Sequence, residues 1–287
     1  IQKSFNERKQ VLLENSGNVL WTQADRSDRA LAAGNSTLDA AGSDLAAALE
    51  VESQHATAAR EALSSDINLK QLLNLDPAVS LQIADLPDPP EITRENVTRA
   101  LQNVVKARPD LLALQAGYHS QEEAVRLSIL QQFPTITFGF DRAADTDGVH
   151  TVGLSVTANL PIFGNTQAAI HVQEATRAQL RAEYQARLDA TTTDAWRIWQ
   201  ETQLLRPQIV LLEEKLPSFR HMAEVSAQAH ANGNLPPATY VLMQTSLQAR
   251  ESELLDLKMS LWNDTIALNT LLAVPLIPIG ESKLGSG

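Results

Sequence analysis

Apolar residues recur every seven positions in the last long stretch of the chain, between Ala238 and Leu272. The heptad positions are Tyr240, Leu247, Leu254, Leu261 and Leu268, with Leu257 and Leu271 at the second apolar position. Such a pattern is typical of a helix that packs along long neighbouring helices, as in a coiled coil. Pro275 follows this stretch, and a proline is expected just beyond the end of a helix.

The chain repeats this pattern at an offset of 199 residues (233 − 34), the distance between its two Gly-Asn pairs. In the first copy the heptad positions are Ala41, Ala48, His55, Ala62 and Leu69, with Val51, Ala58 and Leu72 beside them. These side chains are smaller, so we expect closer helix packing in the first copy. A repeat of this length without gaps indicates a duplicated unit with internal two-fold pseudo-symmetry.

Each copy is predicted to be an antiparallel helical hairpin. In the second copy, a helix rich in Ala, Gln, Glu and Arg runs from about Thr166 to Ala231, which corresponds to a length on the order of 100 Å. Pro207 and Pro217 should bend it locally. Glycine readily takes the left-handed conformation that ends a helix, so the Gly-Asn pairs are the expected turns.

The region between the two copies contains linkers, shorter helices and the one β pattern. Asp76–Glu91 is rich in proline and reads as an extended linker. A helix follows from about Arg94 to Gln132, interrupted near Pro109 because the residue before a proline disfavours helical geometry. Two runs of alternating apolar and small or polar residues then predict an antiparallel hairpin.

That hairpin has one apolar face, and two interpretations of it are open. It could pack on the helices, or it could be part of a transmembrane barrel with its apolar face toward lipid. Alternation by itself favours the first interpretation. The face contains Ile136, Phe138, Phe140, Val152, Leu154 and Val156.

Composition excludes several functions. The chain has 23 Lys and Arg against 34 Asp and Glu, and its net charge of −11 argues against a nucleic-acid partner, which needs a basic face. It has no cysteine, so disulfides and thiolate metal sites are excluded. We identify no catalytic group and no cofactor or metal motif; the six histidines are expected to be solvated or to face a lumen. They are His55, His119, His150, His171, His221 and His230.

Several motifs follow one another in a fixed order along the chain. They are Ala107-Arg108-Pro109-Asp110-Leu111, Phe133-Pro134, the strand pair, Leu160-Pro161-Ile162-Phe163-Gly164-Asn165, Leu216-Pro217, the Gly-Asn turn and Leu271-Leu272-Ala273. This ordered series resembles the outer membrane efflux protein family, which is TolC-like. Leu160–Asn165 and the chain after it look most similar to the CzcC-type heavy-metal efflux branch. The resemblance favours the transmembrane interpretation of the strands.

The resemblance implies a homotrimer that forms one hollow duct across the outer membrane and periplasm of a Gram-negative bacterium. Helical hairpins would form a TolC-like α-barrel, and the strands a barrel in outer-membrane lipid. The duct would export substrate, including heavy-metal cations, from a tripartite pump of the RND type. Its partners would be a periplasmic adaptor (a membrane fusion protein) and an inner-membrane transporter. A periplasmic adaptor, or a structural coiled-coil protein of a transport or secretion assembly, is the alternative.

The resemblance also suggests site residues. Candidates for docking or gating at the helical tips are Gly34, Asn35, Leu38, Gly233, Asn234 and Leu235. Acidic candidates for lining the lumen are Asp25, Asp28, Asp39, Asp44 and Glu224. The six apolar strand residues named above are the lipid-facing candidates.

Seen against the family, the first repeat is expected to lack its N-terminal part, because the counterpart of Arg108 would fall before Ile1. The chain is therefore expected to contain fewer strands than a family member. The expected division is 1–75 for the truncated first hairpin, 76–95 for the linker, 96–134 for ascending helices, 135–163 for the β-hairpin, 164–274 for the second hairpin and 275–287 for the tail.

Overall fold

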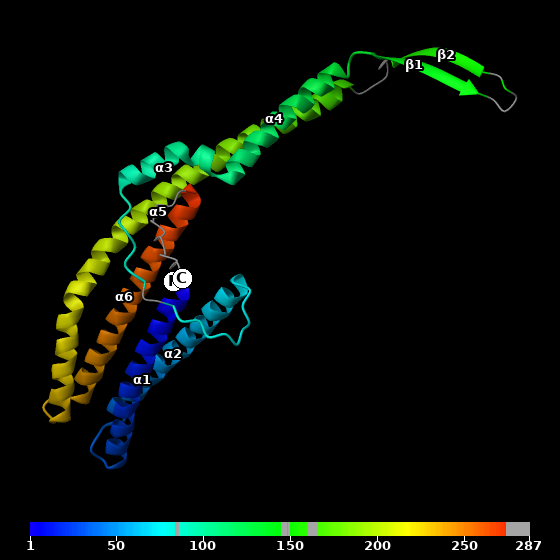
Figure 1. Ribbon diagram of the computed structural model, residues 1–287. Helices are drawn as coiled ribbons and strands as arrows, with labels where there is room; N and C mark the ends of the chain where they lie inside the picture. The colour runs from blue at the N-terminus through cyan, green and yellow to red at the C-terminus, as the bar shows by residue number, and fades with distance from the viewer. Residues whose placement is uncertain (84–85, 145–147, 149, 160–165, 274–287) are drawn as a thin grey trace, which may run out of the picture. The chain divides into compact units, whose positions relative to one another are not determined.

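The computed structural model describes residues 1–83, 86–144, 148, 150–159 and 166–273 (Figure 1). Within them the chain is mainly helical with one antiparallel hairpin, which confirms the predicted fold class. The elements are α1 Gln2–Ala32, α2 Leu38–Leu72, α3 Arg94–Ala107, α4 Pro109–Leu130, β1 Thr135–Ala144, β2 His150–Asn159, α5 Thr166–Ala231 and α6 Pro237–Leu272.

The described residues form two compact units. The first unit contains Ile1–Arg94 and Arg197–Thr270, and the second contains Glu95–Trp196 and residues 271–273. The Leu160–Asn165 motif, Pro275 and the 275–287 tail lie outside the described residues.

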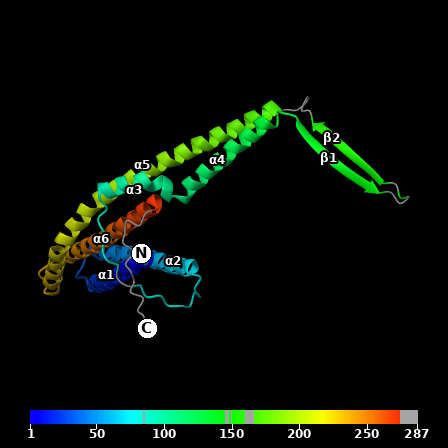
Figure 2. The same cartoon turned by 45° about the horizontal axis from the view of Figure 1, so that its top comes forward.

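The first unit contains the hairpin of α1 and α2, which lie side by side in both views (Figures 1 and 2). Its core combines leucines of α1 with small residues of α2: Leu13 and Leu20 pack with Ala48 and Val51, all at most 2% exposed. The buried side of α2 is shorter than the predicted heptad pattern. Leu72, the last heptad residue at the end of α2, is 84% exposed.

The linker is fastened to the second hairpin inside the first unit. Trp199 of α5 donates from Nε1 to the carbonyl of Ile92 at 2.9 Å. Arg206 of α5 donates from Nη2 to the carbonyls of Pro89 and Pro90 at 3.2 and 2.7 Å. The extended Pro-rich segment exposes its carbonyls, and these two side chains of α5 satisfy them.

In the second unit, the break between α3 and α4 falls at Arg108, which has an extended backbone before Pro109. Helix α4 packs along the first part of α5, with Gln115 donating to the Tyr184 hydroxyl at 3.1 Å. The strands pair antiparallel from Thr135↔Asn159 to Ala144↔His150. This register places the alternating apolar residues of both strands on one face.

Candidate functional site

The two Gly-Asn turns have the same geometry. Gly34 and Gly233 have φ of 73° and 74°, in the left-handed region. The amide of Asn35 donates to the carbonyl of Ala30, and that of Asn234 to Ala229, both at 2.8 Å. This bond from the residue after a left-handed glycine, reaching back five positions, caps the carbonyls of the helix end. The two copies of the sequence repeat therefore have the same backbone geometry at their turns.

Residues beside the turns differ in exposure. Gly34, Asn35, Gly233 and Asn234 are exposed, and Leu38 at the start of α2 is 76% exposed. Leu235 is half-buried. The tip candidates therefore present two glycines, two asparagines and one leucine at the surface of the described residues.

A polar network joins the two hairpins next to these turns, within the first unit. His230, near the end of α5, has Nδ1 3.1 Å from the carbonyl oxygen of Leu235 and Nε2 3.0 Å from Oε1 of Gln23 on α1. Its ring stacks on Tyr240 of α6, with centroids 4.7 Å apart and planes at 6°. Sequence reasoning missed this role, because nothing in the local pattern pairs a residue of one copy with Gln23 of the other.

The same network contains Asp44, one of the acidic lumen candidates. Asp44 is 2% exposed, and its Oδ2 accepts hydrogen bonds from Nε2 of Gln23 at 3.0 Å and from the hydroxyl of Ser27. Burial of a carboxylate costs free energy unless hydrogen bonds compensate, and these two donors do so. The burial of Asp44 inside the first hairpin contradicts the expectation that it lines a lumen.

The other acidic candidates, Asp25, Asp28, Asp39 and Glu224, are exposed. Asp25 and Asp28 border a cavity of about 390 Å³ on the first hairpin, whose walls include Leu38 and Leu45. The exposed Arg26 and Arg29 lie between and beside these carboxylates in the sequence of α1.

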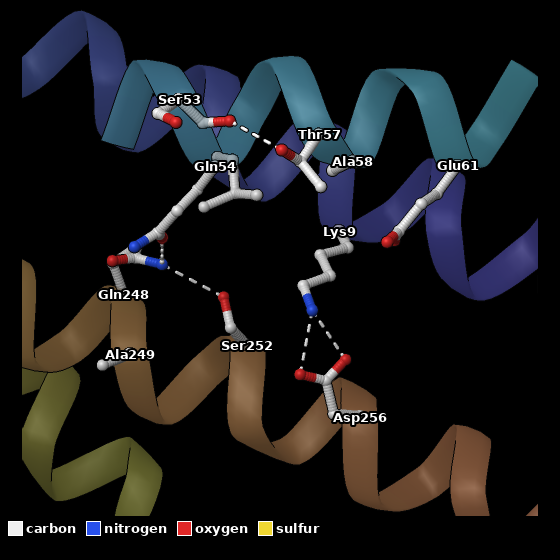
Figure 3. A pocket seen from close by; sticks show the side chains of 11 residues that line it. Lys9, Ser53, Gln54, Thr57, Ala58, Glu61, Gln248, Ala249, Ser252 and Asp256 are labelled. Atoms are coloured by element: carbon white, nitrogen blue, oxygen red, sulfur yellow. Dashed lines mark hydrogen bonds and ion pairs between the residues drawn. The ribbon is translucent and has the colours of Figure 1, made fainter. Parts of the chain in front are cut away.

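A second, polar cavity of about 400 Å³ lies between α1, α2 and α6 in the first unit (Figure 3). Lys9 of α1 reaches across it to both oxygens of Asp256 on α6, at 2.8 and 2.9 Å. Gln248 of α6 donates to Oε1 of Gln54 on α2 at 3.2 Å. Polar side chains thus connect the two hairpins along their length as well as at the turns.

The β-hairpin carries exposed apolar side chains on both of its strands. Phe138 pairs with Val156 and Phe140 with Leu154. All six predicted lipid-facing residues are between 59% and 85% exposed. Monomeric soluble proteins rarely leave so continuous an apolar face uncovered, so this face indicates contact with another apolar phase or partner.

One ion pair in the second unit strongly lowers the pKa of the Asp110 carboxyl group. Arg108 donates from Nε and Nη2 to the two oxygens of Asp110 at 2.9 and 2.6 Å, and from Nη1 to the carbonyl of Leu271 at 3.0 Å. The hydrogen bonds from Arg108 lower the pKa of Asp110 to about 2. Arg108 therefore ties the start of α4 to the end of α6.

The described residues contain no group of three or more His, Cys, Asp or Glu side chains arranged to hold a metal ion. In the same part of the chain, no helix combines the length and the apolar character needed to cross a membrane.

Several solved structures with the same fold are outer-membrane channels. The outer-membrane channel OprN matches with a TM-score of 0.79 at 13% identity over 95% of this chain and 63% of that one. VceC of Vibrio cholerae matches with a TM-score of 0.78 at 16% identity, over 95% of this chain and 67% of that one. MtrE of Neisseria gonorrhoeae, in its open state, matches with a TM-score of 0.75 at 16% identity, over 96% of this chain and 65% of that one. The chain thus spans about two thirds or less of the length of these channels.

The sequence itself matches no curated protein. It does match the family described as outer membrane efflux protein, over residues 100–274, which is more than half of the chain. That range includes α4, both strands, the long helix α5 and the second Gly-Asn turn. The family is one of transport ducts, in agreement with the prediction that the protein is not an enzyme. The chain therefore belongs to the outer membrane efflux protein family, as the sequence motifs had indicated.

Proposed function

We propose that the protein is the exit duct of a tripartite efflux system in the outer membrane of a Gram-negative bacterium. The β-hairpin contributes to a barrel in lipid, and the helical hairpins extend into the periplasm. The observation that carries the proposal is the strand pair: Phe138, Phe140 and Leu154 share an exposed apolar face. The opposite face has only small or polar residues such as Thr137 and Ser155, as expected for a barrel strand between lipid and water.

Lysine substitutions on the two strand faces test this proposal. Phe138→Lys with Leu154→Lys puts charges on the lipid side, which costs roughly 2–4 kcal/mol each near the bilayer midplane. We expect loss of the protein from the outer-membrane fraction of cells. Thr137→Lys with Ser155→Lys, the neighbouring positions on the other face, is the matched control and should insert. Normal insertion of the Phe138→Lys/Leu154→Lys variant would refute the proposal that the protein is an outer-membrane duct.

The functional unit that we propose is a homotrimer. Exposed apolar residues include Leu204, Leu211, Met222 and Val225 on α5, and Leu38, Leu45, Leu49, Leu63 and Ile67 on α2. Leu204 and Leu211 are seven residues apart, as are Leu38 and Leu45, and this spacing suits packing against helices of another copy. Leu204→Lys with Leu211→Lys should lower the trimer fraction in light scattering, whereas Gln228→Lys at an exposed site should not.

The proposed partners are a periplasmic adaptor and an inner-membrane transporter, which would meet the duct at its turns. The exposed residues Gly34, Asn35, Leu38, Gly233 and Asn234 form the proposed docking surface, with Leu235 beside them. Leu38→Asp should weaken adaptor binding in a pull-down and leave membrane insertion intact, which separates docking from assembly.

Heavy-metal cations are the proposed cargo, in line with the net charge of −11 and the exposed Asp25, Asp28, Asp39 and Glu224. An acidic path raises the local concentration of cations. Asp25→Asn with Asp28→Asn should reduce the cation preference of single-channel conductance in planar bilayers. Glu50→Gln, at an exposed carboxylate of α2, should change it less. Equal selectivity in both variants would remove the basis for a cationic cargo.

A further inference from the structure

Both ring nitrogens of His230 face oxygen atoms. The atom opposite Nδ1 is the backbone carbonyl oxygen of Leu235, which can only accept a hydrogen bond. The atom opposite Nε2 is Oε1 of Gln23. A neutral imidazole has one N–H and one lone pair, so it can complete only one of these contacts.

The orientation of the Gln23 amide follows from the groups behind it. The Ser27 hydroxyl donates to Oδ2 of Asp44, so its oxygen is free to accept from Nε2 of Gln23, 3.2 Å away. Nε2 of Gln23 also donates to Asp44 at 3.0 Å. Turning the amide over would place its oxygen against the Asp44 carboxyl. Gln23 therefore presents Oε1 to His230, and both contacts are hydrogen bonds only when the histidine donates at both nitrogens.

We infer that His230 is a proton-dependent latch between the two helical hairpins: the contact to Gln23 and Leu235 is complete only when the imidazole carries both protons. The positive ring is then linked through Gln23 to Asp44. It also stacks on Tyr240, where a cation gains from the face of the aromatic ring.

Tyr240 and Arg26 also lie near His230. Burial raises the pKa of Tyr240, an effect that Arg26 of α1 partly opposes, so Tyr240 stays neutral. Arginine stays charged in proteins. Histidine is the side chain whose ordinary titration falls between about pH 5 and 8. The latch is therefore complete while the imidazole carries both protons, and it weakens as pH rises and the imidazole loses one of them.

The contact joins α1 to the end of α5 directly beside the second turn, where Leu235 follows Gly233 and Asn234. Loss of the second hydrogen bond leaves the Gln23 oxygen facing a nitrogen lone pair, which favours separation of the hairpins at this end. The use of this separation in opening the duct rests on the proposed function; the latch itself does not.

Spin labels on the two hairpins test the inference directly. The chain has no cysteine, so Ala33→Cys with Asn232→Cys labels only these exposed, symmetry-equivalent positions. We expect one dominant label distance at pH 5.5 and a second, longer one at pH 8.0. The ratio of separated to latched populations should rise roughly tenfold, as for the loss of a hydrogen bond with a charged partner. Identical distributions at the two pH values would overturn the inference.

Three variants connect the pH effect to its atoms. His230→Gln cannot carry the charge and should show the same distribution at both pH values, whereas His221→Gln, exposed on the same helix, should keep the wild-type change. In Asp44→Asn the Gln23 amide can turn over, so a neutral histidine completes the contact and the pH dependence decreases. A pH response that persists in His230→Gln would overturn the inference. The measurement needs neither insertion nor conduction, so its result is independent of the strand variants.

Discussion

Arg220 of α5 forms an ion pair with Glu251 of α6, with Nε 2.6 Å from Oε1. At the equivalent positions of the first hairpin, 199 residues earlier (220 − 21), the indole Nε1 of Trp21 lies 3.4 Å from a carboxylate oxygen of Glu52. The two copies thus conserve a hydrogen bond between their helices and the glutamate that accepts it. The donor is an indole in the first hairpin and a guanidinium in the second.

The two cross-links should differ in strength. A hydrogen bond between an ionised donor and acceptor is shorter and stronger than one with a neutral donor, but Arg220 is half exposed and solvent screens the pair. We expect a coupling free energy of about 0.5–1 kcal/mol for Arg220 with Glu251 and a smaller one for Trp21 with Glu52. Double-mutant cycles to alanine in urea unfolding measure both. A larger coupling in the first hairpin would contradict this ranking.

Alanine at the glycines of the turns should destabilise the hairpins. Gly34 and Gly233 have positive φ, where a Cβ costs about 1–2 kcal/mol. A Cβ added at Gly42, inside α2, would meet no atom within 4 Å. Gly42→Ala should therefore stabilise by up to about 1 kcal/mol, because alanine favours helix over glycine. Thermal unfolding followed by circular dichroism distinguishes the two directions. An unchanged melting temperature in Gly233→Ala would contradict the expected backbone strain at this turn.

The long helices and their turns could be predicted from the sequence because their signals are local. The predicted helix from Thr166 to Ala231 coincides with α5. The left-handed glycines follow from the absence of a side chain, and the alternation of β1 and β2 fixes which residues share a face. None of these features depends on which distant residue lies nearby.

Features that depend on pairing between distant segments could not be predicted. Asp44 has the sequence surroundings of a solvated helix residue, yet Gln23 and Ser27 of the neighbouring helix allow it to be buried. His230 meets a residue 207 positions away. The contacts of Trp199 and Arg206 with the linker likewise arise only when the chain is folded, since heptad and alternation patterns do not encode polar partners.

The ion pair of Asp110 should make the second unit sensitive to strong acid. The pKa of Asp110 is about 2 in the folded chain, below that of an unfolded aspartate. The stabilisation is therefore present above about pH 4 and is lost as pH falls toward 2. Since the side chain is 37% exposed, we expect no more than about 1 kcal/mol.

Asp110→Asn should remove this part of the pH dependence of unfolding between pH 4 and 2. Asp189→Asn is the control, because Asp189 is exposed on α5 and bonded to the neutral amide of Gln185. An unchanged acid profile in Asp110→Asn, measured by the same unfolding titration, would show that Arg108 does not stabilise the ionised carboxyl.

The β-hairpin contains a close approach that can be tested by a second substitution. Gly139 pairs with Ser155, and the Ser155 hydroxyl occupies the space in which a Cβ at position 139 would lie. Alanine is otherwise favoured over glycine in a strand by roughly 0.5–1 kcal/mol. We expect Gly139→Ala to bring this gain in a Ser155→Ala background and to lose it when Ser155 is present, because the hydroxyl must turn away.

The control for this prediction is Gly153→Ala. With open space around its Cβ, it should bring the same gain in both backgrounds. Amide hydrogen exchange of Phe138 and Phe140 reports the strength of pairing in each variant. Additive effects of the substitutions at 139 and 155 would show that the two side chains do not compete for this space.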